Sequence, residues 1–290
     1  MPARPPLIES IQRIPLQTVN IDGHNIAYLD TGNGPPLLLI HGLGGAIWNW
    51  EHQQFALSSQ YRVITIDLLG SGMSDKPDID YSPSMFTTFF LKFMNTLDIE
   101  KATLVGNSMG AGLAMAIALT QPDRVNALVL ISGFPSTFKE SIHSPLYQRY
   151  LERRPPLWLA KIGNWVAGRW ATKKVLEEIL YDVTLLTPIV IERSYLNRIH
   201  TDVLTPIYSL LEHMKEWEIQ YGAHLQKIEH PTLILWGAED QVFHPAIGER
   251  LHERLPQTTW RLIPHAGHLL QWEKPEPVNA AIRDFLAKRQ

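Results

Sequence analysis

The sequence contains no cysteine among its 290 residues. This absence excludes disulfide bonds, thiolate metal ligands and a cysteine nucleophile. It also fits a reducing compartment, and we expect a cytoplasmic protein. No secretory signal is expected at the N-terminus, because residues 1–16 carry three charged residues and four prolines and lack an apolar core.

The chain has no large excess of charge of either sign. It holds 26 Lys and Arg against 29 Asp and Glu, a net charge of −3. Proteins that bind nucleic acid usually show a strong basic excess, so we expect no nucleic-acid partner. The same balance gives no reason to expect an anionic membrane surface as a partner.

One segment, residues 102–119, is apolar enough to suggest a membrane span. However, Asn107 and Ser108 lie near its middle, between Gly106 and Gly110. A strand, a sharp turn and a buried helix explain this pattern better than a span does. We therefore expect no membrane partner.

Short, continuous apolar runs recur along the chain, separated by helical patterns. Such runs are typical of parallel strands that are buried on both faces. The runs lie at 37–40, 63–66, 103–105 and 127–131, and further strands are expected at 232–236 and 259–263. Helices are expected from about residue 50 and over 84–97, 108–120, 245–255 and 277–286. Two earlier runs, 17–21 and 25–29, flank Asp22-Gly23, which predicts a β-hairpin.

The strand pattern stops after Gly133 and resumes near residue 232. Between them, Trp158, Ile162 and Trp165 are spaced i, i+4 and i+7, which predicts one face of a helix. Pro188 suits the first position of another helix. We divide the chain into a first part of an α/β core (1–133), a helical cap (134–226) and a second part of the core (227–290).

The segment Gly106-Asn107-Ser108-Met109-Gly110 follows a predicted strand and precedes a predicted helix. This context is what the Gly-x-Ser-x-Gly nucleophile elbow requires. The sharp turn exposes the serine hydroxyl, and the helix N-terminus favours negative charge that develops beside it. The alternative is that the two glycines only allow tight packing of strand and helix.

A serine nucleophile needs a base and an acid that orients the base. In this arrangement the acid and then the histidine follow the serine along the chain. Two loops after predicted strands supply them. We favour Asp240 over the adjacent Glu239, because it lies further into its loop. We favour His268 over His265, because Gly267 lets the chain turn the imidazole inward.

The oxyanion requires two backbone donors. One is the N–H of Met109, directly after the nucleophile. The other is expected from the loop His41-Gly42-Leu43-Gly44-Gly45, whose glycines permit N–H groups that point inward. We assign the N–H of Leu43, with that of Gly44 as the alternative.

Together these segments resemble the α/β-hydrolase superfamily. The resemblance rests on His41-Gly42, the segment Asp67 to Asp75, Gly106 to Gly110, Trp236-Gly237-x-x-Asp240 and Gly267-His268. It implies an α/β fold with an eight-stranded, mostly parallel sheet, flanking helices and a helical cap inserted after the sixth strand. It also implies Ser108, Asp240 and His268 as a catalytic triad. In the segment Asp67 to Asp75 it implies a structural turn.

Within this superfamily a serine at the elbow points to a serine hydrolase that cleaves small, largely apolar carboxylic esters. Meta-cleavage-product C–C hydrolases are the alternative, because the elbow and His268-x-x-Gln271-Trp272-Glu273 are similar to theirs. The chain departs from that subfamily at the oxyanion loop, at Ala111 and at Leu269. Two further alternatives are a ligand-binding or accessory protein without activity and a cofactor-free perhydrolase.

The expected substrate is a small molecule, and no metal or cofactor is expected. We predict that it contacts Gly42, Asn107, Trp158 and Leu269. The other tryptophans of the cap are expected mostly to pack within it. Two cap arginines, Arg193 and Arg198, could bind a substrate carboxylate, although a surface ion pair with Glu192 is the favoured interpretation for either. We expect a monomer or a homodimer.

Overall fold

The computed structural model describes residues 9–133, 144, 148–149, 152–199 and 202–289. Its core is one eight-stranded sheet in the order β1-β2-β4-β3-β5-β6-β7-β8. The strands are β1 (Gln17–Ile21), β2 (His24–Thr31), β3 (Pro36–Ile40), β4 (Arg62–Ile66), β5 (Ala102–Asn107), β6 (Val125–Ile131), β7 (Thr232–Gly237) and β8 (Thr258–Ile263). All pairs from β4 to β8 are parallel, whereas β2 is antiparallel to both of its neighbours. The predicted fold class is confirmed.

The predicted hairpin joins β1 to β2. Asp22 and Gly23 form its turn with φ angles of 51° and 87°. Two successive positive φ angles give the type I′ turn whose twist matches that of the strands. The register pairs Ile21 with His24 across this turn, as a two-residue loop requires.

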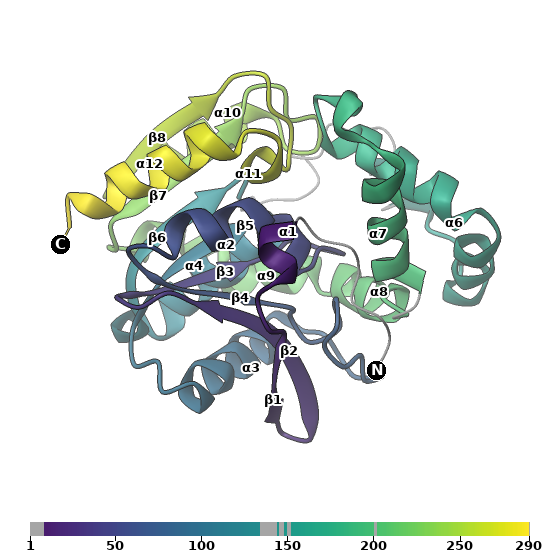
Figure 1. Ribbon diagram of the computed structural model, residues 1–290, viewed down its shortest axis with the longest axis horizontal. Coiled ribbons are helices and arrows are strands. Elements are labelled where there is room, and N and C mark those ends of the chain that lie inside the picture. The colour runs from purple at the N-terminus through teal and green to yellow at the C-terminus, as the bar shows by residue number, and fades with distance from the viewer. Residues whose placement is uncertain (1–8, 134–143, 145–147, 150–151, 200–201, 290) are drawn as a thin grey trace.

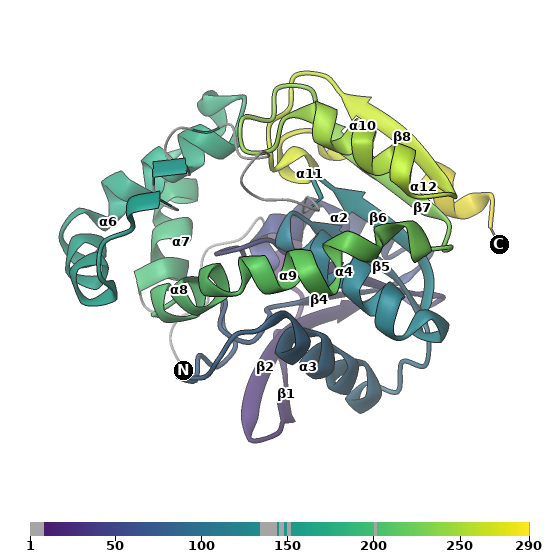
Figure 2. The same cartoon turned by 180° about the vertical axis from the view of Figure 1, so that it is seen from behind.

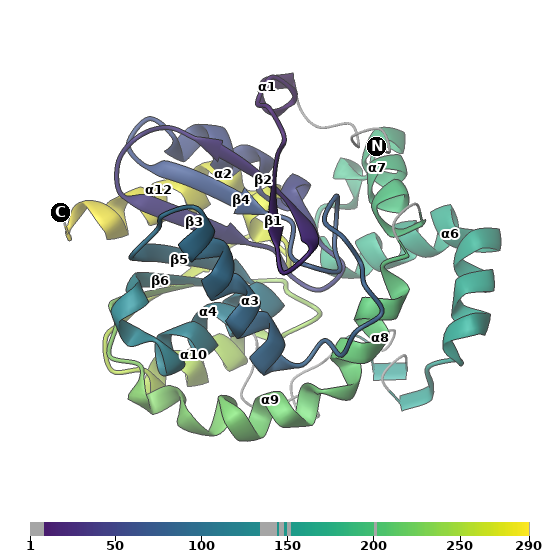
Figure 3. The same cartoon turned by 90° about the horizontal axis from the view of Figure 1, so that it is seen from below.

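Helices cover both faces of the sheet, as Figures 1 and 3 show. Along β3, Leu38 and Ile40 pack in the core that contains α3 and α4, whereas Leu37 and Leu39 pack against α2 and α12 on the opposite face. This alternation explains why the strand is apolar at every position. The core helices are α2 (Glu51–Leu57), α3 (Pro83–Thr96), α4 (Met109–Thr120), α10 (Pro245–Arg254), α11 (Leu270–Glu273) and α12 (Pro275–Ala287). Short helices α1 (Glu9–Gln12), η1 (Ile47–Trp50) and η2 (Pro122–Arg124) complete the core.

A group of helices lies between β6 and β7, in the stretch that the sequence assigns to the cap. They are α6 (Leu157–Ile179), η3 (Val183–Leu185), α7 (Pro188–Ile199), α8 (Leu204–Glu212), α9 (Met214–Gln220) and η4 (Gly222–Lys227). Pro188 is the first residue of α7, as predicted. Figure 2 shows α8 and α9 running from the cap along the core. No helix within the described part of the chain is both long enough and apolar enough to cross a membrane.

Candidate active site

Ser108 occupies a sharp turn between β5 and α4, as the sequence predicts. Its backbone has φ 53° and ψ −118°, a conformation that costs a residue with a Cβ free energy. Gly106 and Gly110 make the turn possible. A Cβ on Gly106 would lie 2.3 Å from the carbonyl carbon of Gly110, and one on Gly110 would lie 2.2 Å from the carbonyl oxygen of Ile40.

Asp240 and His268 form the acid and imidazole pair that the sequence predicts. Nδ1 of His268 lies 2.9 Å from Oδ2 of Asp240, and both side chains are buried. The second carboxylate oxygen, Oδ1, accepts hydrogen bonds from the N–H groups of Val242 and Phe243 at 2.9 and 3.0 Å. These bonds fix the carboxylate, and the carboxylate in turn fixes the orientation of the imidazole.

The neighbouring acid and histidine have different surroundings. Oε2 of Glu239 accepts a hydrogen bond from the N–H of Ala266 at 3.0 Å, so this carboxylate supports the histidine loop. His265 has a φ of 57° and an exposed side chain near Tyr181. The structure therefore pairs Asp240 with His268, the residues preferred from the sequence.

Asn107 connects the serine turn to the histidine loop. Its Nδ2 donates to the carbonyl oxygens of Ile131 and His268, at 3.2 and 3.1 Å. Asn107, which precedes Ser108 in the chain, therefore holds the backbone of His268 against the end of β5. Both amide protons of Asn107 are used in these two hydrogen bonds. The predicted contact of Asn107 with substrate therefore gains no support.

The loop expected to supply the second oxyanion donor lies against the nucleophile. A Cβ on Gly42 would lie 3.1 Å from Cβ of Ser108, so only a small residue allows this approach. Gly44 has a φ of 67°, which turns the loop after Leu43. Met109 is the first residue of α4, where a helical N–H has no partner within its own helix.

His41 holds this loop in place. Its Nε2 accepts a hydrogen bond from the N–H of Leu68 at 3.1 Å, so Nδ1 carries the proton and donates to the carbonyl oxygen of Gly42 at 2.8 Å. Burial lowers the pKa of His41 to about 4. A neutral, fully buried imidazole is thus a structural part of the oxyanion loop.

The segment from Asp67 to Asp75 is a structural turn, as the resemblance implies. The two carboxylate oxygens of Asp67 each accept a backbone N–H at 2.7 Å, one from Ile47 and one from Met73. Ser74 Oγ accepts the N–H of Ala27 at 2.9 Å. These bonds hold the turn against β2 and η1, beside the oxyanion loop.

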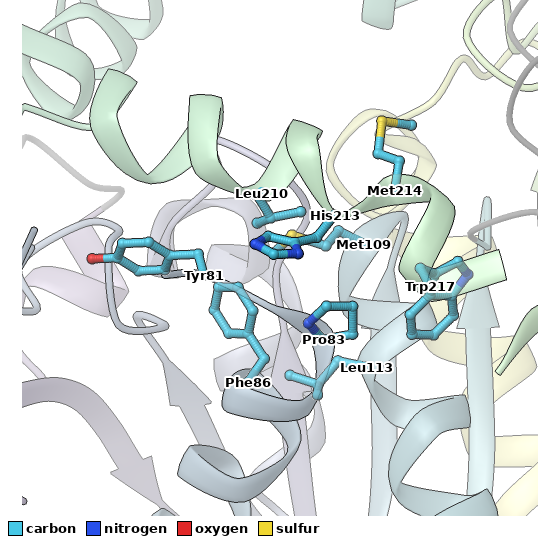
Figure 4. A pocket seen from close by; sticks show the side chains of 9 residues that line it. All are labelled: Tyr81, Pro83, Phe86, Met109, Leu113, Leu210, His213, Met214 and Trp217. Carbon is cyan, nitrogen blue, oxygen red and sulfur yellow. The ribbon is translucent and has the colours of Figure 1, made fainter. Parts of the chain in front are cut away.

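An apolar pocket lies beside the elbow, between the core and the cap helices α8 and α9 (Figure 4). Its lining comprises Tyr81, Pro83, Phe86, Met109, Leu113, Leu210, His213, Met214 and Trp217. Met109 directly follows the nucleophile, and Leu113 lies one turn further along α4. The pocket therefore begins next to the predicted oxyanion donor.

His213 supplies the imidazole of this pocket and joins the cap to the core. Its ring forms hydrogen bonds with Asp80 of the core and, at 2.6 Å, with Glu216 of α9. Partial burial lowers the pKa of His213, but the two carboxylates outweigh this effect and raise it. An apolar ligand in this pocket would therefore meet one polar group.

Glu273 connects the cap to the histidine loop. Its Oε1 accepts the N–H groups of Tyr181 and Asp182 at 2.8 and 2.9 Å, and its Oε2 accepts that of Gly267 at 2.7 Å. The N–H of His268 also donates to the carbonyl oxygen of Ile179, at 2.8 Å. Burial raises the pKa of Glu273. The sequence showed Glu273 as part of a motif but not its role, because two of its partners are backbone groups about 90 residues away.

Arg193 does not pair with Glu192, so that prediction is wrong. Glu192 pairs with Arg169 on the surface of the cap at 2.7 Å. Arg193 is instead buried against Glu51 of α2, with Nη2 2.8 Å from Oε1, and its guanidinium stacks on Trp48. No motif in the sequence pointed to Glu51 as the partner. The side chain of Arg198 lies outside the described residues.

The tryptophans of α6 do not pack as expected, whereas Trp217 of α9 is buried. Trp158, Trp165 and Trp170 of α6 are 64%, 76% and 65% exposed, so the prediction of packing is wrong for Trp165 and Trp170. Trp158 does not line the pocket beside the elbow, and its predicted contact with substrate gains no support. Leu269 is buried among apolar residues of the cap and core, including Leu180 and Trp272.

Comparisons with known proteins agree with this geometry. A family model described as the alpha/beta hydrolase fold matches residues 35–275. A 2-hydroxy-6-oxononadienedioate/2-hydroxy-6-oxononatrienedioate hydrolase of Paraburkholderia phymatum is 33% identical over 91% of both chains. Among solved structures, a membrane phospholipase A is 26% identical with a TM-score of 0.82, covering 97% of this chain and 89% of that one. A mutant meta-cleavage product hydrolase is 27% identical with a TM-score of 0.79, covering 94% and 98%.

Proposed function

The chain belongs to the α/β-hydrolase fold family, and on that basis we propose that it is a serine hydrolase of small, largely apolar carboxylic esters. The observation that carries the mechanism is the buried hydrogen bond between Asp240 and His268, tied through Asn107 to the strained Ser108. In the proposed enzyme, the imidazole of His268 activates the hydroxyl of Ser108 as a general base.

In the proposed reaction, Ser108 Oγ attacks the ester carbonyl while His268 takes the hydroxyl proton. Asp240 stabilises the imidazolium that forms, and the N–H groups of Met109 and Leu43 bind the oxyanion. The imidazolium then protonates the departing alcohol, which leaves an acyl-enzyme on Ser108. Water attacks this acyl-enzyme with His268 as base, which releases the carboxylic acid and restores the serine.

The apolar pocket supports an uncharged acyl or alkyl group as the part of the substrate that is recognised. It begins at Met109, and most of its lining side chains are apolar. Arg193, the cap cation considered for a substrate carboxylate, is already neutralised by Glu51.

Hydrolysis of a C–C bond is the second candidate, and the sequence relatives support it better than they support ester cleavage. The relative from Paraburkholderia phymatum carries the name of such a dienedioate hydrolase, and one structural neighbour is a meta-cleavage product hydrolase. The same serine, histidine and aspartate would serve this reaction. The substrate would additionally have to be held as a carboxylated chain while carbon is protonated.

Turnover of two substrate sets separates the candidates. We expect kcat/KM for neutral short and medium esters to exceed that for a carboxylated 2-hydroxy-6-oxo-dienoate by at least about tenfold, a transition-state difference of about 1.4 kcal/mol. The Ser108→Ala variant is the control for both, and loss of turnover and of fluorophosphonate labelling is expected. A faster reaction with the dienoate would make C–C hydrolysis the main activity.

The same assays test the remaining alternatives. A protein that turns over neither substrate and does not react with the fluorophosphonate would be a binding or accessory protein. Faster peracid formation from hydrogen peroxide than hydrolysis of the same acyl group would indicate a perhydrolase.

A further inference from the structure

The first half of α6 exposes large apolar side chains to solvent. Trp158, Ile162 and Trp165 lie on one side of the helix at i, i+4 and i+7, with Leu159 and Val166 beside them. Between 45% and 76% of each of these side chains is exposed. Trp170 continues the surface beyond a kink at Ala167. We call these six residues the α6 apolar face.

The described part of the cap does not cover the α6 apolar face. The buried residues of α6 are Gly168, Thr172 and Leu176, all beyond the kink, so no residue before it is buried. Figures 1 and 2 both show α6 at the outer edge of the cap, away from the sheet. A short helix owes most of its stability to packing of its apolar side. An exposed apolar surface of this kind marks an interaction site.

The charge around the α6 apolar face is positive, although the chain as a whole is negative. Residues 149–179, which extend to the end of α6, contain seven Lys or Arg and three Glu, whereas the whole chain has a net charge of −3. The four cations of α6 form exposed ion pairs: Lys161 with Asp202, Arg169 with Glu192, and Lys173 and Lys174 with Glu177. Exposed pairs contribute little free energy, so the cations can exchange these acids for other anions.

This combination favours a lipid surface over a second copy of the chain. Trp residues concentrate at membrane interfaces, because the indole ring is apolar and its N–H remains hydrated. Interfacial helices combine such residues with Lys and Arg, which anionic lipids attract. In a two-fold dimer the same positive region would face itself and repel. A protein partner would need an acidic apolar groove, for which nothing on this chain argues.

We propose that the α6 apolar face docks the protein on the surface of a bilayer that contains anionic lipid. The tryptophans enter the interface, and Lys161, Arg169, Lys173 and Lys174 remain at the level of the headgroups. The cap then faces the membrane, and the protein is bound to it without spanning it. This proposal goes beyond the proposed hydrolysis and departs from the expectation that the protein has no membrane partner.

Flotation of the full-length protein with vesicles tests the proposal. Vesicles of phosphatidylcholine and phosphatidylglycerol at 3:1 are compared with pure phosphatidylcholine. The double variant Trp165→Ser/Trp170→Ser removes two side chains that are 76% and 65% exposed. The matched control, Phe55→Ser/Ile219→Ser, removes two exposed apolar side chains outside α6, each 64% exposed. Melting curves confirm that both variants are folded.

The wild type and the control are expected to float with anionic vesicles, and the partition coefficient of the α6 variant is expected to be at least tenfold lower. Wild-type binding should be weaker on pure phosphatidylcholine vesicles, which lack anionic lipid. It should also be weaker in 0.5 M salt, because salt screens exposed charges. Equal flotation of the α6 variant, or no flotation of the wild type, would overturn the proposal. A wild-type dimer that the α6 variant converts to a monomer, measured by light scattering, would instead assign the face to self-association.

Discussion

Arg193 of the cap and Glu51 of the core form an ion pair in which both side chains are almost fully buried, 3% and 1% exposed. Nη1 of the arginine also donates to Oε2 of the glutamate at 2.9 Å. The other carboxylate oxygen, Oε1, accepts the indole N–H of Trp272 at 2.8 Å. Trp272 belongs to α11, which begins two residues after His268, so the pair joins the cap to the helix that follows the predicted base.

Removal of one partner of this pair should destabilise the protein strongly. Arg193→Met leaves Glu51 as a buried, uncompensated charge, and we expect a loss of about 3–5 kcal/mol in the free energy of unfolding. The double variant Arg193→Met/Glu51→Gln should recover most of this lost stability, because the amide oxygen still accepts the indole N–H of Trp272. Urea unfolding measures both. Arg169→Met, which breaks an exposed pair, should change the free energy of unfolding little, and a cost equal to that of Arg193→Met would argue against the buried pair.

Ser108 should be replaceable by glycine with a gain in stability. Its φ of 53° strains any residue that has a Cβ, so Ser108→Gly should raise the free energy of unfolding by about 1 kcal/mol. Ser108→Ala retains the Cβ and should show no such gain. Both variants should lose ester turnover by roughly 10⁴-fold, because the hydroxyl is gone. Equal stability of the two variants would mean that the turn is unstrained in solution.

The two adjacent acids should differ sharply in their effect on catalysis. Asp240→Asn is expected to lower kcat by about 10³–10⁴-fold, because the amide no longer stabilises the imidazolium of His268. Glu239→Gln should change kcat by less than about tenfold, since its carboxylate accepts the backbone N–H of Ala266 rather than holding the imidazole. Steady-state kinetics on a chromogenic ester measure both, and similar losses would contradict the assignment of the acid.

His41 should make the stability depend on pH. Its folded pKa of about 4 lies below the ordinary value of 6.5, so between these values the unfolded chain binds a proton that the folded chain does not. The free energy of unfolding should therefore fall as pH falls from 6.5 to 4, by at most about 3 kcal/mol from this residue. His41→Gln should flatten this part of the profile, and the exposed His224→Gln should leave it unchanged. A profile that His41→Gln does not alter would contradict a neutral buried imidazole.

Glu273 should affect turnover although it lies outside the triad. Glu273→Gln replaces one carboxylate oxygen with an NH₂ group, which cannot accept a hydrogen bond from a backbone N–H. Either Gly267 or the Tyr181–Asp182 segment is then held less firmly. We expect kcat to fall by about tenfold, the equivalent of one hydrogen bond, with little change in KM. The exposed Glu276→Gln is the matched control. A normal kcat for Glu273→Gln would show that its hydrogen bonds do not position the base.

Local patterns predicted the strands and the turn at Ser108, and the resemblance to the α/β-hydrolase superfamily implied the eight-stranded sheet and the candidate triad. The apolar runs predicted β3 to β7, because strands buried on both faces are apolar throughout. β8 is partly exposed and contains Arg261, so only the return of the strand pattern predicted it. Asp22-Gly23 predicted the hairpin from backbone conformation alone. The nucleophile turn followed from two glycines four residues apart, whose missing Cβ atoms the structure shows to be necessary.

The sequence by itself determined which residues form strands, helices and turns, since these depend on neighbours within a few positions. Only the tertiary structure decided which sides of the helices face solvent and which distant groups meet. The spacing of Trp158, Ile162 and Trp165 showed that they share a side of α6, but periodicity cannot say whether that side is covered. Arg193 lies beside Glu192 in the chain yet pairs with Glu51, 142 residues away, because the cap folds back and buries that arginine against α2.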